Sequence, residues 1–174
     1  MGANNCIQRH QIRNTDQFMI SLPCSHYTLH SDYCMNHTAM KSRKLTTPPI
    51  EVNSAMLAYE FFKPLGNLEV EEVWALALGP SLKSLRAKMI FRGSVSSCLV
   101  HPREIFRFAL TENASNLILA HNHPSQETNP STEDLNMTNQ LILVGRLIEI
   151  PLLDHLVITR KSFVSLREAK WCEF

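Results

Sequence analysis

Residues 73 to 78 are apolar at every position, and the run ends at Gly79-Pro80. A short, uninterrupted apolar run that stops at a turn signal predicts a strand buried on both faces of its sheet. Because such a strand needs other elements packed on each side, the run favours a layered architecture.

The segments around this run alternate between helical and strand-like patterns. Pro64 and Gly66 are expected to end the first helix, and Pro102 to begin the second. The alternation predicts an α/β fold, a layered α-β-α sandwich with a mixed sheet. The expected helices are 52–63, 103–113, 132–147 and a short one after Ser165, and the expected strands are 73–78, 85–92, 97–101, 117–121 and 152–159.

The N-terminal part of the chain shows no sustained periodicity. Thr46-Thr47-Pro48-Pro49 predicts an extended linker, because consecutive prolines disfavour helix. We therefore expect residues 1–50 to form a poorly ordered extension and residues 51–174 to form the domain. A small zinc knuckle in the extension is the alternative, but its Cys and His residues lack the usual two short ligand pairs. These residues are Cys24, His26, His30, Cys34 and His37.

Composition excludes several functional classes. Seventeen Lys and Arg against sixteen Asp and Glu leave a net charge of +1, so direct nucleic-acid binding is not expected. The five glycines are too widely spaced for a phosphate-binding loop. The chain lacks an apolar run long enough to span a membrane and an apolar signal-peptide core near its start, and its five cysteines are scattered. These features predict a cytoplasmic protein with reduced thiols and no membrane contact.

A possible metal site begins at His121-Asn122-His123. Two histidines separated by one residue at a strand end project to the same side, about 7 Å apart along the chain. Asp134 falls in the first turn of the next expected helix, and two His, one Asp and a water are a typical ligand set of hydrolytic zinc. However, solvated histidines are common, and a capping box would account for Ser131 and Asp134 without a metal.

Three sequence blocks occur in an order that is similar to one known family. The spacing of His121-x-His123 and Ser131-x-x-Asp134 resembles the metal signature of the JAMM (MPN-positive, JAB) metallopeptidases, whose fold is related to that of cytidine deaminases. Within this group, the chain resembles the RadC family from about Ser54 to Phe163. The blocks are Val100-His101-Pro102-Arg103-Glu104-Ile105-Phe106-Arg107, Leu119-Ala120-His121-Asn122-His123-Pro124-Ser125 and Leu152-Leu153-Asp154-His155.

The resemblance implies one Zn²⁺ per chain, bound by the two histidines and Asp134. It also implies a catalytic Glu, which we place at Glu72 at the start of the buried strand, and an oxyanion-binding role for Ser131. Glu71 is the alternative; its side chain points to the opposite face if the strand includes both residues. Glu104 is a second alternative, but an acidic residue in the first turn of a helix is explained by the helix dipole.

The implied function is that of a zinc-dependent metalloprotease or isopeptidase, which hydrolyses a peptide or isopeptide bond with water activated by zinc and a Glu. The expected partner is a protein or peptide substrate. The alternatives are a non-catalytic metal-containing binding module and a DNA-repair-associated accessory protein. Gln126 departs from the glycine that is usual in the family, and its cost is about 1 kcal/mol if the position needs a positive φ. Asp154 and His155 match the family without an assigned role, and oligomeric state is not encoded in these motifs.

Overall fold

The computed structural model describes residues 49–93 and 100–174. The predicted extension 1–50 therefore lies outside the described residues except at its last two positions, and so does most of the strand predicted at 97–101. The helices are α1 (Ala55–Phe62), the 3₁₀ helix η1 (Lys63–Asn67), α2 (Pro102–Thr111) and α3 (Thr132–Leu147), and the strands are β1 (Glu72–Leu78), β2 (Ser84–Arg92), β3 (Asn116–Asn122), β4 (Leu152–Ile158) and β5 (Phe163–Ser165).

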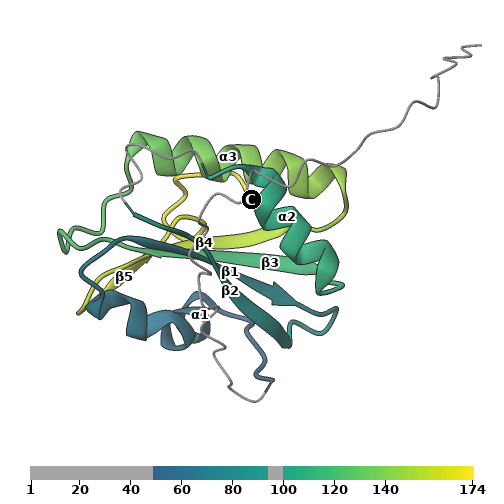
Figure 1. The fold of residues 1–174 in the computed structure, drawn as a ribbon, viewed down its shortest axis with the longest axis horizontal. Helices are drawn as coiled ribbons and strands as arrows, with labels where there is room; N and C mark the ends of the chain where they lie inside the picture. The colour runs from purple at the N-terminus through teal and green to yellow at the C-terminus, as the bar shows by residue number, and fades with distance from the viewer. Residues whose placement is uncertain (1–48, 94–99) are drawn as a thin grey trace, which may run out of the picture. The chain divides into compact units, whose positions relative to one another are not determined.

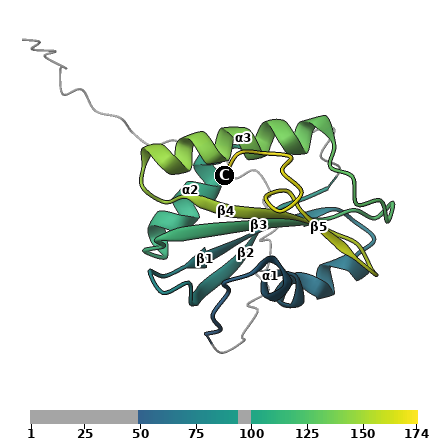
Figure 2. The same ribbon diagram turned by 180° about the vertical axis from the view of Figure 1, so that it is seen from behind.

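The strands form one mixed sheet in the order β2-β1-β3-β4-β5. The β3–β4 pair is parallel, and the other neighbouring pairs are antiparallel. Helix α1 lies on one face of the sheet, and α2 and α3 lie on the other (Figures 1 and 2). The predicted α/β class and the α-β-α sandwich are thus confirmed.

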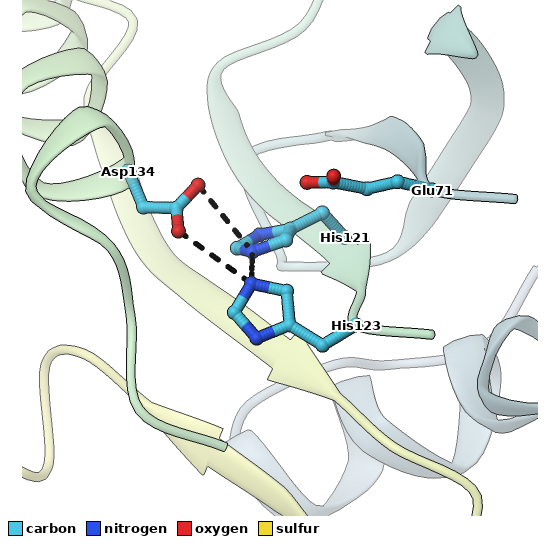
Figure 3. A group of neighbouring side chains, drawn as sticks. All are labelled: Glu71, His121, His123 and Asp134. Atoms are coloured by element: carbon cyan, nitrogen blue, oxygen red, sulfur yellow. Dashed lines mark hydrogen bonds and ion pairs between the residues drawn. The ribbon is translucent and has the colours of Figure 1, made fainter. Parts of the chain in front are cut away.

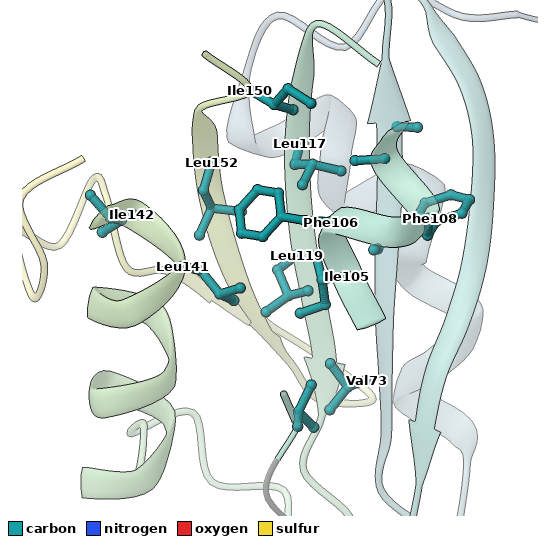
Figure 4. Close-up of a cluster of buried hydrophobic side chains, with 14 of the residues drawn as sticks. Val73, Ile105, Phe106, Phe108, Leu117, Leu119, Leu141, Ile142, Ile150 and Leu152 are labelled. Carbon is teal, nitrogen blue, oxygen red and sulfur yellow. The ribbon is translucent and has the colours of Figure 1, made fainter. Parts of the chain in front are cut away.

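Strand β1 is buried along its whole length, as its uninterrupted apolar run predicts. Val73, Ala75 and Ala77 face the core under α2 and α3, part of which is shown in Figure 4. Trp74 and Leu76 face the second core, under α1. Both faces of this strand are therefore covered by apolar layers, with the odd-numbered residues on one face and the even-numbered residues on the other.

The short helix predicted after Ser165 is wrong. Strand β5 pairs with β4 over three positions and ends at Ser165, and the residues that follow form an isolated turn in which Trp171 N donates to Leu166 O at 2.9 Å. Lys170, with φ 57°, interrupts any helical continuation. Pairing of β5 with β4 is a tertiary contact, so the local residue pattern did not indicate it.

Membrane crossing requires a long apolar helix, and the helices within the described ranges are all too short or too polar for it.

Candidate metal centre

The two histidines of the H-x-H pattern lie at the carboxyl end of β3, where the chain leaves the sheet for α3. Alternation along the strand sends both rings to the face covered by α3. Their Nε2 atoms are 2.9 Å apart, and His121 is fully buried while His123 keeps 15% of its side-chain surface exposed (Figure 3). The predicted pair therefore converges on one point at the sheet edge.

Asp134 approaches this point from the first turn of α3. Its Oδ2 accepts hydrogen bonds from Ser131 N at 2.8 Å and Ser131 Oγ at 2.6 Å, which completes a capping box. Its Oδ1 lies 3.4 Å from His121 Nε2 and is buried without a hydrogen-bond partner in the described part of the chain. The cap and the ligand interpretations of this carboxylate are compatible, because each uses a different oxygen.

The chemistry of the donor atoms suits a tetrahedral cation, and their positions come close to what one requires. His123 Nδ1 lies 2.8 Å from the Glu127 carbonyl oxygen, which can only accept, so this nitrogen carries the ring proton and leaves a lone pair on Nε2 of the neutral ring. Ligands at about 2.0–2.2 Å from a tetrahedral ion are roughly 3.3–3.6 Å from one another. The distance from Asp134 Oδ1 to His121 Nε2, 3.4 Å, falls in this range, whereas the two histidine Nε2 atoms, 2.9 Å apart, must move slightly apart to take up tetrahedral positions.

The charges of the site indicate the same preference for a cation. Burial alone would raise the pKa of Asp134, but the adjacent imidazoles of His121 and His123 hold that pKa well below its usual range. The Asp134 hydrogen bond raises the pKa of His123. The metal-free site therefore favours a proton on His123 beside an ionised carboxylate, and a divalent ion would have to displace that proton.

The structure corrects the placement of the acidic residue. The ligand-type atoms of Glu71, His121, His123 and Asp134 all lie within 4.8 Å of one another, and Figure 3 shows the Glu71 side chain extending toward His121. Glu72, the predicted residue, is 2% exposed on the other face. Its Oε2 accepts from Trp74 Nε1 at 2.8 Å.

The reason for the correction is the register of the sheet. Val73 pairs with His121 across the β1–β3 ladder, so these two residues share a face. Glu71 is two positions from Val73 and shares that face, whereas Glu72 follows Trp74 to the α1 side. Since residues 73–78 are apolar at every position, the sequence offered no amphipathic signal for choosing between the two parities. Glu104, the other alternative, forms an ion pair with Arg107 on the exposed surface of α2.

Asn122, between the two histidines, is a site residue that sequence reasoning missed. Its side chain is fully buried on the α1 face of β3. Its Oδ1 accepts from Glu72 N at 2.8 Å, and its Nδ2 donates to Val70 O at 3.1 Å. These bonds hold the backbone on both sides of Glu71 to the strand that carries the histidines, so Asn122 positions Glu71.

Comparison with known proteins gives the family. A family model described as the RadC-like JAB domain matches residues 35–171. The chain belongs to the RadC-like JAB domain family. It is 45% identical over 101 residues to a UPF0758 protein of Halalkalibacterium halodurans; the aligned region covers 58% of this chain and 44% of that protein. It is 32% identical over 133 residues to a UPF0758 protein of Symbiobacterium thermophilum; this aligned region covers 76% of this chain and 57% of that protein. The chain thus spans about half the length of these relatives.

In this RadC-like JAB domain, Ser131 lies beside the candidate metal ligands. Its Oγ donates its single proton to Asp134 Oδ2 and accepts from Asp134 N at 3.1 Å. The hydroxyl is therefore fully engaged in the cap of α3.

The Asp154-His155 pair of the RadC-like domain divides between the two faces of β4. Asp154 binds the C-terminal segment: its Oδ2 accepts from Ser165 Oγ at 2.7 Å and its Oδ1 from Arg167 N at 3.3 Å. Burial raises the pKa of Asp154. His155 faces the candidate metal ligands, with its Nε2 2.8 Å from His121 Nδ1, and burial lowers the pKa of His155 well below the usual value.

Proposed function

We propose that this domain is a zinc-dependent metallopeptidase or isopeptidase of the JAMM type. One observation carries the proposal: His121 Nε2, His123 Nε2 and Asp134 Oδ1 converge on one point, and the Glu71 carboxylate faces it. Two nitrogens and one oxygen suit zinc, and three protein ligands leave a tetrahedral position open for water or substrate.

A zinc ion held by these residues would lower the pKa of a water molecule and polarise a substrate carbonyl. The protein's own contribution begins with Glu71, which is held beside the site by Asn122 and is only partly buried. Its carboxylate takes the proton of the attacking water and returns that proton to the leaving amine as the C–N bond breaks. The products are a carboxylate and an amine, with water consumed.

We assign Ser131 a second role, as a donor to the oxyanion that forms on the attacked carbonyl. Its proximity to Asp134 supports this role. The hydroxyl proton now points to Asp134 Oδ2, so it must rotate toward the substrate when the carbonyl binds.

The proposed partner is a protein or peptide, because the open position accommodates an amide carbonyl. We propose a cytoplasmic location, which the five scattered cysteines of the sequence favour because they lack the paired pattern of a disulfide framework.

Metal content tests the site. Protein purified without added metal is expected to contain one zinc ion per chain, measured by inductively coupled plasma mass spectrometry. The His121→Ala, His123→Ala double variant is expected to contain no zinc. Wild-type protein that contains no zinc, and takes up none on dialysis, would remove the basis of the proposal.

Cleavage of a proteome-derived peptide library in H₂¹⁸O tests the reaction. New carboxyl termini are expected to carry ¹⁸O. Glu71→Gln should abolish cleavage while retaining zinc, and Glu72→Gln is the matched control on the other face. Peptide binding without cleavage by the wild type would favour the binding module, and cleavage retained in Glu71→Gln would exclude Glu71 as the base.

A further inference from the structure

We propose that Thr138 and His155 form a hydrogen-bond relay that sets the tautomer of His121, so that its Nε2 presents a lone pair to the metal. The inference rests on the proposed metal-binding function. It concerns two residues that do not contact the metal position themselves, and it makes them positioning residues for one ligand.

The direction of each hydrogen bond follows from counting donors. Thr138 Oγ1 lies 2.6 Å from the Asp134 carbonyl oxygen, which can only accept, so the single hydroxyl proton is used there. Thr138 Oγ1 also lies 2.6 Å from His155 Nδ1. With its proton already donated, the hydroxyl oxygen accepts, and the proton of the neutral His155 ring is therefore on Nδ1.

The same count of hydrogen-bond donors also determines which nitrogen of His121 carries the proton. His155 Nε2 is left with a lone pair, and it lies 2.8 Å from His121 Nδ1. His121 must donate from Nδ1, which leaves its Nε2 unprotonated on the side of His123 and Asp134. The relay thus produces the tautomer that a metal ion requires.

Burial makes this order of protons the stable one. His121, His155 and Thr138 are each 0% exposed, so bulk water does not compete for these bonds. Both ring nitrogens of His155 are bonded to neutral groups, and an imidazolium there would be a buried charge without a partner. Because the Nδ1 proton of a neutral His155 is donated to Thr138 Oγ1, this ring can accept a hydrogen bond only on Nε2.

The relay also closes on a metal ligand. Thr138 is one turn along α3 from Asp134 and binds the backbone carbonyl of that residue, while the Asp134 carboxylate faces His121. Thr138 is thus bonded to the backbone of one proposed ligand, Asp134, and begins the chain of hydrogen bonds that orients another, His121. A histidine freed from this chain would populate both tautomers, and the Nε2-protonated form cannot bind a metal.

Zinc affinity of Thr138 variants tests the relay. Thr138→Val keeps the shape and removes the hydroxyl, and it is expected to weaken zinc binding by about 10- to 100-fold in competition with a chelator. Thr138→Ser restores the hydroxyl and should restore the affinity. Thr159→Val is the matched control: Thr159 is 2% exposed and donates to Ser162 O at 2.8 Å, so it loses a buried hydroxyl bond elsewhere and should keep wild-type zinc affinity.

A second measurement needs no metal. Long-range ¹H–¹⁵N NMR spectra of the metal-free wild type are expected to show His121 and His155 protonated on Nδ1. A proton on His121 Nε2, or a Thr138→Val variant that folds and binds zinc as tightly as the wild type, would overturn the relay. If the wild type itself binds no zinc, the proposed function fails, and the NMR result still decides the relay.

Discussion

Gln126 adopts a left-handed backbone conformation, φ 67°, in the loop that follows His123. The position therefore does require a positive φ, which a residue other than glycine adopts at a cost of about 1 kcal/mol. Its side chain offsets part of this cost. Gln126 Oε1 accepts from Arg160 N at 2.8 Å, and Nε2 donates to His123 O at 3.3 Å. The side chain thus connects the loop after His123 to the turn between β4 and β5.

Two substitutions at this position separate the backbone cost from the side-chain bonds. Gln126→Ala keeps the left-handed strain and loses the bonds, whereas Gln126→Gly loses the bonds and the strain. We expect the glycine variant to be more stable than the alanine variant by about 1 kcal/mol in urea unfolding with a chelator present. An alanine variant at least as stable as the glycine variant would contradict this.

At the scale of elements, the start of α3 couples helix formation to the site. Ser131 caps the helix, and the carboxylate that completes the capping box also carries the proposed oxygen ligand. Ser131→Ala is expected to lower the free energy of unfolding of metal-free protein by about 1 kcal/mol, because Asp134 N loses its acceptor. Ser131→Thr, which keeps a capping hydroxyl, should change it by only a few tenths of a kcal/mol. Chemical denaturation measures both, and equal stability of the three proteins would argue against the cap.

The packing of η1 against the turn after β4 gives a second prediction at this scale. A Cβ atom added to Gly66 would overlap the carbonyl group of Thr159, which is backbone and cannot rotate away. Gly66→Ala is expected to lower the free energy of unfolding by about 1–3 kcal/mol. Gly79→Ala is the control, because its nearest contact would be Leu85 Cδ2 at 3.6 Å, and its effect should stay within about 0.5 kcal/mol. The two midpoints in urea are compared; equal midpoints would contradict the packing argument.

At the scale of the whole molecule, local pattern predicted most elements and the three side chains that converge in the candidate metal centre, but not the long-range register. The apolar run 73–78 and the position of Asp134 after a capping Ser131 are local signals, and both led to features that the structure contains. The choice between Glu71 and Glu72 depends on the pairing of Val73 with His121, which are 48 positions apart. The short β5, and the contacts of Asn122 and His155, depend on such pairing too. A single sequence does not contain this information in any one segment.

The pH dependence of stability joins the site to the folding of the whole domain. The pKa of His123 is raised by its hydrogen bond to Asp134, which stays ionised because its own pKa is well below the usual range. A raised folded-state pKa contributes stability that is complete below the unfolded value of about 6.5 and is lost as the pH rises through the folded value. Zinc requires the deprotonated ring, so the stability gained from zinc follows the opposite trend.

The prediction compares wild type with His123→Gln between about pH 5.5 and 9. With a chelator, the wild type should be more stable than the variant at the acidic end, and the difference should shrink as the pH rises above 6.5 through the pKa of His123. With saturating zinc, the difference should grow with pH over the same range, because protons no longer compete for the ring. Taking the difference removes most of the contribution of His155, which is present in both proteins and whose lowered pKa acts in the opposite sense. Thermal and urea unfolding measure the two series. A difference that is independent of pH in both would mean that His123 does not exchange a proton for a metal ion.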